Sequence, residues 1–156
     1  MNNWRDIDID ALEGEYMTPE ELVPNIPPVL AAQVSQSAQE AKQAMALGQW
    51  LQALQVVLSN PPYVTDLPQV KEQHAQTVFD VLVAVRNNLG PQDLGPKFIQ
   101  QLTPDQQDTL IKYLYKNMST PYGAKQGGVL LAWFEKTIEI TGVGSIVRFM
   151  SDRRTV

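Results

Sequence analysis

The chain of 156 residues contains no cysteine and a single histidine, His74. Without cysteine it can form no disulfide, no zinc–thiolate site and no thiol nucleophile, and this composition fits a reducing compartment. His74 falls on or beside an apolar helical stripe, without the nucleophile and orienting carboxylate that a histidine relay requires. We therefore predict a structural histidine and expect no catalytic residue, no metal site and no cofactor.

Long apolar runs and an excess of basic charge are also missing. A membrane-spanning helix needs about 20 apolar residues, and the longest candidates, such as residues 127–134, are far shorter. The first residues lack the apolar core of a secretion signal. The net charge is −5, whereas a protein that binds nucleic acid usually presents a basic patch to the phosphates. We therefore expect no nucleic acid, no membrane and no export.

The acidic charge is concentrated at the N-terminus. Residues 1–28 contain seven acids and one base, whereas the remaining residues contain ten acids and eleven bases. Four prolines, at positions 19, 24, 27 and 28, disfavour helix in the first segment, because proline restricts both itself and its predecessor. The chain is therefore predicted to consist of an extended acidic arm and proline-rich linker at residues 1–28 and a helical body at residues 29–156.

Within the arm, apolar and acidic residues alternate. In an extended chain Ile7 and Ile9 lie on one face and the neighbouring aspartates on the other. A disordered solubilising tail would account for the charge, but a tryptophan beside alternating isoleucines favours an arm that becomes ordered on a partner. The candidate partner-binding residues of the arm are Trp4, Arg5, Asp6, Ile7, Asp8, Ile9 and Asp10.

The spacing of the aspartates in the arm resembles the start of a calcium-binding loop. Such a loop also needs glycine at its sixth position and glutamate at its twelfth. Counted from Asp6, those positions hold Ala11 and Met17. A calcium site is therefore not predicted.

From residue 29 onward, apolar residues recur at three- and four-residue spacing, which is typical of amphipathic helices. The stripes fall at residues 34–45, 50–58, 70–89, 94–102, 110–118, 129–138 and 146–150. Gly48 reads as a helix stop, and Thr103, Pro104 and Gln106 form a capping-box start. Residues 119–123 are predicted to be a loop, and Ser145 to cap the last helix. The predicted fold class is all-α, with about seven short helices in a compact α-α superhelical body.

One alternative for the body is a tetratricopeptide-like adaptor that binds peptides on its own. Residues 48–54 resemble the second half of a tetratricopeptide unit. The next proline comes too early for that repeat, and no second copy follows. A non-repeating stack of helices therefore agrees better with the sequence.

Three basic or glycine-rich features suggest possible contact surfaces. Lys112 and Lys116 are one helical turn apart and are predicted to share a solvated face. The glycine-rich residues 142–145 lack the lysine and preceding strand of a phosphate-binding loop, so they are predicted to form a tight turn. The last nine residues contain three cations, Arg148, Arg153 and Arg154, and one acid. They either complement the dipole of a final helix or form a basic edge that faces a partner.

Several segments, in order along almost the whole chain, resemble one known family. They are residues 5–10, 53–54, 59–62, 70–71, 112–116, 130–136, 142–148 and 152–156. The segment Gly-Val-Gly-Ser-Ile-Val-Arg at 142–148 is long and the most specific of them. The sequence thereby resembles the smallest-subunit family (subunit 5) of the actin-related protein 2/3 complex, the assembly that nucleates branched actin filaments.

The resemblance implies a non-catalytic structural subunit in the cytoplasm, at cortical structures of the actin cytoskeleton. It implies that the helical body docks on the core subunits, chiefly the small subunit 4, and that the arm tethers actin-related protein 2. Trp4, Ile7 and Ile9 would then supply buried anchors, and the aspartates would supply complementary charge. The actin filament would be contacted indirectly, and ATP would be bound by the actin-related subunits.

Overall fold

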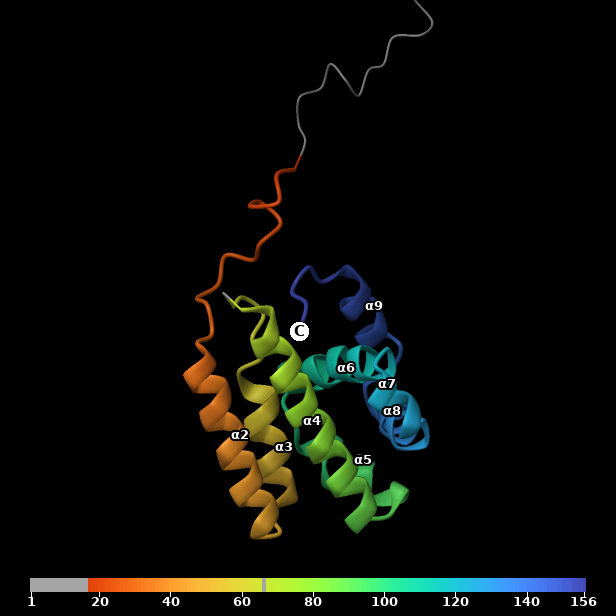
Figure 1. Ribbon diagram of the computed structural model, residues 1–156. Coiled ribbons are helices and arrows are strands. Elements are labelled where there is room, and N and C mark those ends of the chain that lie inside the picture. Colours follow the sequence, from red (N-terminus) through yellow and green to blue (C-terminus); the bar gives the residue numbers. More distant parts are fainter. Residues whose placement is uncertain (1–16, 66) are drawn as a thin grey trace, which may run out of the picture.

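The computed structural model of the chain describes residues 17–65 and 67–156, and within these ranges all the regular structure is helical (Figure 1). The elements are α2 (Ala31–Ala46), α3 (Trp50–Ser59), α4 (Pro68–Asn88), η1 (Pro91–Asp93), α5 (Leu94–Lys97), η2 (Ile99–Gln101), α6 (Pro104–Met118), α7 (Pro121–Lys125), α8 (Gly127–Thr141) and α9 (Gly144–Ser151). The predicted all-α fold class is confirmed. Among the described residues, no helix combines the length and the apolar character that crossing a membrane requires.

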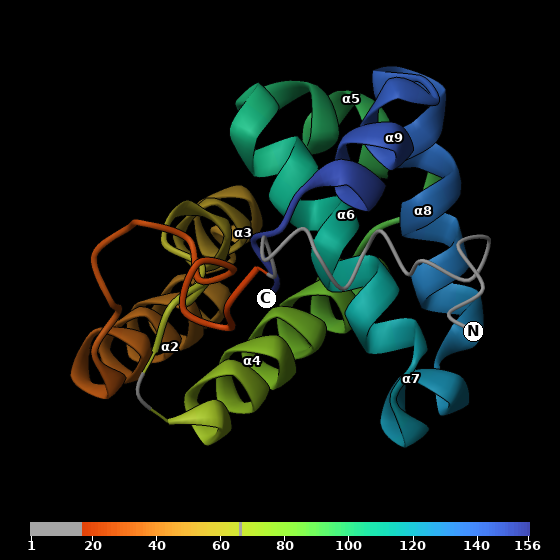
Figure 2. The ribbon, with the colours of Figure 1, turned by 90° about the horizontal axis from the view of Figure 1, so that it is seen from above.

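The central element of the body is α6. Helices α2, α3 and α4 lie side by side, and α6 lies between them and the pair α8 and α9 (Figures 1 and 2). Six consecutive residues of α6, from Thr109 to Leu114, are buried. A helix that is buried around its whole circumference must be covered on every side. This is why α6 contacts α3, α4, α7, α8 and α9.

Two ring side chains tie the outer helices into the core. Trp133 of α8 is fully buried and donates a hydrogen bond from Nε1 to the carbonyl oxygen of Leu82 in α4 at 3.0 Å. His74 of α4 is buried, and its Nε2 lies 2.8 Å from the carbonyl oxygen of Val57 in α3. Burial lowers the pKa of His74, because the charged imidazolium would lose its hydration. His74 is therefore a structural residue, as the sequence predicts.

The helix ends follow local chemistry. Gly48 has a φ of 72° and closes α2, where its N–H bonds to the carbonyl of Met45 and the N–H of Gln49 bonds to that of Ala44. This is the Schellman arrangement that favours glycine. At the start of α6, Thr103 Oγ1 accepts from the N–H of Gln106, whose side chain accepts in return. Both boundaries are confirmed.

Three local predictions differ from the structure. The loop predicted at residues 119–123 instead contains the start of α7, because Thr120 caps the N–H of Gly123 and Pro121 occupies the first helical position. The single helix predicted at 94–102 is divided into α5 and η2. Ser145 lies inside α9 and does not cap it; its hydroxyl donates to the carbonyl of Gly142 and thereby holds the turn between α8 and α9.

The arm residues Trp4–Asp10 lie outside the described part of the chain. Residues 17–30 form no helix, and the N–H of Val29 donates to the carbonyl of Val64 at 2.9 Å. That bond fixes the point at which the linker meets the body. The division between the arm and the body at residue 28 stays a prediction.

Replacing Trp133 with alanine should destabilise the body. The change leaves a cavity between α4, α8 and Phe98, whose ring meets the indole edge-on at 6.1 Å between centroids, and it removes the hydrogen bond to Leu82. The expected loss is about 3–5 kcal/mol of unfolding free energy, measured by chemical denaturation. Leu131→Ala, an exposed position of the same helix, is the control and should change stability by less than about 0.5 kcal/mol. Equal losses for the two variants would contradict this account of the core.

Candidate partner-binding site

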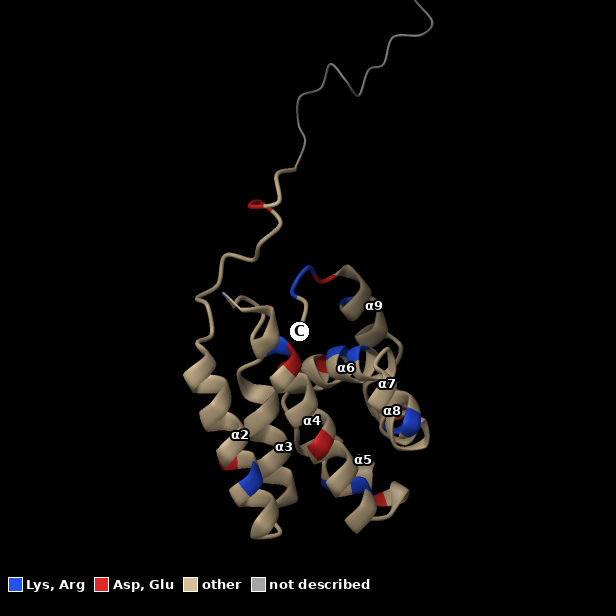
Figure 3. Ribbon diagram, viewed as in Figure 1, with Lys and Arg blue, Asp and Glu red and all other residues tan. Residues whose placement is uncertain are grey.

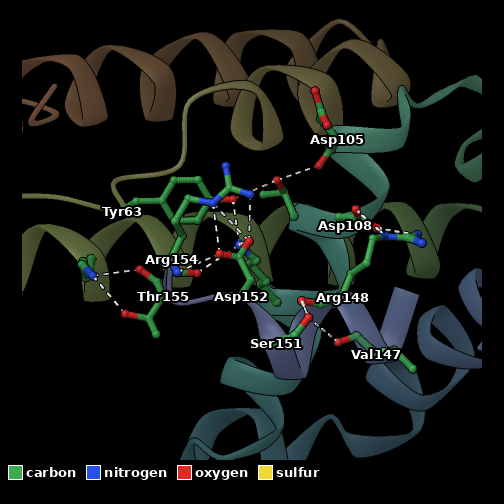
Figure 4. A network of polar contacts seen from close by, with 12 residues as sticks. Tyr63, Asp105, Asp108, Val147, Arg148, Ser151, Asp152, Arg154 and Thr155 are labelled. Carbon is green, nitrogen blue, oxygen red and sulfur yellow. Dashed lines mark hydrogen bonds and ion pairs between the residues drawn. The ribbon is translucent and has the colours of Figure 1, made fainter. Parts of the chain in front are cut away.

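Several charged groups of the body meet where the chain ends. Beyond α9, residues 152–156 leave the helix and run along α6 and the loop that contains Tyr63 (Figures 3 and 4). We refer to residues 152–156 as the C-terminal segment. Two lysines from different helices donate to its main chain: Lys71 of α4 to Thr155 at 2.8 Å and Lys116 of α6 to Val156 at 3.0 Å.

Lys112 of α6 lies beneath this segment and is only 4% exposed. Its ammonium donates to the carboxylate of Asp152 at 2.8 Å, to the carbonyl of Arg154 at 3.0 Å and to the hydroxyl of Tyr63 at 3.3 Å. It also lies 4.4 Å from the centroid of the Tyr63 ring, a favourable cation–π position. All three donors of the ammonium are satisfied.

The predicted solvated face of α6 is therefore wrong at Lys112. The apolar neighbours of Lys112 along the chain, Ile111 and Tyr113, are themselves buried. A helix flanked by five other elements leaves no open side for a lysine. Lys116, one turn later, is partly exposed and pairs with Glu72 at 3.0 Å.

Asp152 connects Lys112 to Arg154. The guanidinium of Arg154 donates to both carboxylate oxygens of Asp152, at distances of 2.8–3.1 Å (Figure 4). The hydrogen bonds from Arg154, together with those from Lys112 and the Arg154 main chain, lower the pKa of Asp152 well below its usual range, although partial burial opposes them. The C-terminal segment is thus held by a charged network of which one member, Lys112, is buried.

The three candidate arginines of the basic edge differ in whether they form ion pairs within the chain. Arg148 forms a two-point pair with Asp108 of α6 through contacts of 2.8, 2.9 and 3.1 Å, and Arg154 is paired with Asp152. Both line a mixed-charge hollow of about 380 Å³ next to Tyr63. Arg153 is exposed and forms no ion pair with any residue in the described ranges. A partner-facing role for this edge stays a prediction. Among its three arginines, Arg153 is the one without an ion pair to a described residue.

The sequence predicts a solvated position for Lys112 and does not single out Tyr63. Apolar residues flank Lys112 on both sides, but the same helix also carries Asp105, Asp108 and Lys116, so the local sequence does not mark Lys112 as buried. Nothing local to Tyr63 marks it, because its partners lie 49 and 91 positions further along the chain. The candidate residues of the arm, Trp4, Arg5, Asp6, Ile7, Asp8, Ile9 and Asp10, lie outside the described residues.

The described body is thus an all-helical bundle in which one buried cation, Lys112, binds the C-terminal segment. The chain matches, over residues 3–156, the family described as the ARP2/3 complex 16 kDa subunit (p16-Arc). It belongs to this family, which confirms the resemblance found in the sequence.

Named relatives match over most of their length. The actin-related protein 2/3 complex subunit 5 of Saccharomyces cerevisiae is 43% identical over 99% of this chain and 98% of its own length. Subunit 5-C of Xenopus laevis is 38% identical over 75% of this chain and 74% of its own length. The human subunit 5-like protein is 30% identical over 99% of this chain and 95% of its own length.

Removing the carboxylate of Asp152 should destabilise the body. Asp152→Asn leaves the buried ammonium of Lys112 without a counter-charge, at an expected cost of about 1–3 kcal/mol at pH 7. The matched control is Asp93→Asn, which breaks the exposed pair of Asp93 with Lys97 and should cost less than about 1 kcal/mol. Urea denaturation of both variants measures the difference, and equal small losses would show that the network does not stabilise the fold.

The stabilising effect of the Asp152 carboxylate should also depend on pH. The pKa of Asp152 is lower in the folded chain than in the unfolded chain, so its stabilising contribution is complete above about pH 4 and is lost as the pH falls further. The stability difference between wild type and Asp152→Asn should therefore shrink between pH 7 and pH 2. A difference that stays constant over that range would mean that Asp152 does not titrate as the geometry implies.

Proposed function

We propose that this chain is a non-catalytic structural subunit of the actin-related protein 2/3 complex, the assembly that nucleates branched actin filaments. The observation that carries the proposal is family membership over residues 3–156, with 43% identity to a named subunit 5 across nearly the whole of both chains. The name of that relative describes a subunit of a complex, which supports a structural role. Its place in the cell would then be the cytoplasm, at the actin cytoskeleton.

The helical body would dock on the core subunits, chiefly subunit 4. Supporting this, the described body exposes large apolar side chains in a row at the start of α9 and along it, at Val143, Val147 and Met150. Contiguous exposed apolar surface on a small helical body is typical of proteins that bind other proteins.

The N-terminal arm would tether actin-related protein 2. Its support is the alternation of Ile7 and Ile9 with aspartates, together with Trp4. The bond from Val29 to Val64 fixes the end of the linker on the body. A fully extended segment of 28 residues can span roughly 95 Å, so the tethered subunit need not touch the body. ATP binding and filament templating would belong to the actin-related subunits.

Native affinity purification tests the proposed membership of the complex. A tagged chain should recover the actin-related assembly in stoichiometric amounts. Recovery of the chain by itself would instead favour the free-standing, tetratricopeptide-like adaptor.

Deleting residues 1–16 should distinguish the docking of the body on the core subunits from the tethering of actin-related protein 2 by the arm. The truncated body is expected to remain in the complex, because residues 41–156 form a continuous apolar core of their own, while actin-related protein 2 should dissociate more readily. The measurement is the ratio of actin-related protein 2 to the core subunits after native purification and washing. Retention of that subunit at the wild-type ratio would contradict a tether.

Two double variants of the full-length chain distinguish the contribution of the apolar anchors of the arm from that of its charges. Ile7→Ala with Ile9→Ala should reduce retention at any salt concentration, because the apolar anchors would supply most of the affinity. Asp6→Asn with Asp8→Asn should mainly slow association and weaken its dependence on salt.

A further inference from the structure

Helix α9 has apolar residues on two faces, and only one of them is covered by the body. Its inner face packs on α6, where Phe149 stacks on Tyr115 with centroids 4.3 Å apart. On its outer face, Val143, Val147 and Met150 are 67%, 61% and 74% exposed. Their spacing of four and three residues places them in one row. That row is about 10 Å long, or two helical turns.

A mainly apolar groove of about 410 Å³ opens beside Met150. Tyr115, Phe149, Met150 and Val156 supply its apolar walls, and Lys116 stands among its lining residues. The groove has the size to accept an apolar side chain of a partner, and methionine at its edge can adapt to the shape of that side chain.

The charges around the exposed row favour an acidic partner. The last nine residues contain three arginines and one aspartate. Arg148 and Arg154 are each held by a carboxylate of the chain itself, whereas Arg153 is exposed and has no ion pair with a described residue. A carboxylate placed next to Arg153 would therefore be attracted without breaking an existing pair.

Leu47, the most exposed of the other large apolar residues in the described ranges, lacks these features. It lies at the turn between α2 and α3, at the opposite end of the body from α9 (Figure 1). Its exposure equals that of Met150, at 74%, but the polar residues around the adjacent small hollow are mainly glutamines. The one charged residue that lines this hollow is an acid, Glu40, and Leu47 has no row of exposed apolar residues beside it.

We propose that the outer face of α9, together with the groove beside Met150, is the surface by which the body docks on another subunit of its complex. The occupant is an amphipathic helix of that subunit. Its apolar stripe lies along Val143, Val147 and Met150, one apolar side chain enters the groove, and a carboxylate faces Arg153. The inference rests on the proposed function and specifies which face of the body carries the docking contact.

Charge substitutions at two equally exposed positions test this surface. Tagged Met150→Glu should recover roughly tenfold less of the complex than wild type, because a carboxylate cannot enter an apolar contact without losing its hydration. Leu47→Glu is the matched control and should recover the wild-type amount. Circular dichroism and thermal unfolding of both variants should match wild type, since neither side chain contributes to the core.

A labelling experiment gives an independent readout without disrupting the contact. Because the chain has no cysteine, Val147→Cys and Leu47→Cys each introduce a single thiol into it. In the purified complex, maleimide should modify Cys at position 47 and leave the one at position 147 protected. In the separated chain, both should react.

The outcomes distinguish the surface from the function. If wild type recovers the complex, but Met150→Glu recovers as much and the thiol at 147 is fully labelled, the docking surface is wrong while the proposed function stands. If wild type recovers no actin-related assembly, the proposed function itself fails. Protection at 147 only in a homodimer of the separated chain would assign the surface to a second copy and would also overturn the inference.

Discussion

The buried ammonium of Lys112 constrains one whole end of the molecule. Moving a charged amine out of water costs several kcal/mol unless other groups replace its hydration. Here Asp152, the carbonyl of Arg154 and the hydroxyl of Tyr63 replace it. Two of these groups belong to the C-terminal segment, so departure of the segment would remove two of the three partners that replace the hydration of the ammonium. The central helix and the end of the chain are therefore stabilised together.

This constraint extends to the neighbouring elements. With Asp152 fixed, α9 is held across α6, and the Arg148–Asp108 pair adds a second link between the same two helices. The linker reaches the same end, because Val29 bonds to Val64, the residue after Tyr63. In the proposed function, the arm and the α9 surface would thus lie at the same end of the body, which the contacts of Lys112 hold together. A pull on the arm would act on the loop of Tyr63, which the Lys112 network already holds.

The fold class and most helix boundaries could be predicted because their causes are local. The capping box at Thr103 and the glycine at position 48 act on residues within one turn, and the structure contains both. Thr120 and Pro121 form the same kind of helix start, but a helix of five residues carries no apolar stripe, so the sequence pattern predicts a loop there. The burial of Lys112 was not local. It depends on groups 40 and 42 positions later in the chain, which only the packing of the C-terminal segment brings together.

The candidate site could be predicted in part, and the reason lies in α9. Its residues Ile146, Val147, Phe149 and Met150 read as one core stripe, although in a helix they point in different directions. A short helix at the edge of the body, packed mainly on α6, leaves some of those directions uncovered, and here the body covers Phe149 and leaves Val147 and Met150 exposed. A sequence in which a terminal helix holds more apolar residues than its neighbours can cover therefore contains information about a partner. The basic residues nearby conveyed less, because two of the three arginines are neutralised within the chain, and only the structure distinguishes those two from Arg153.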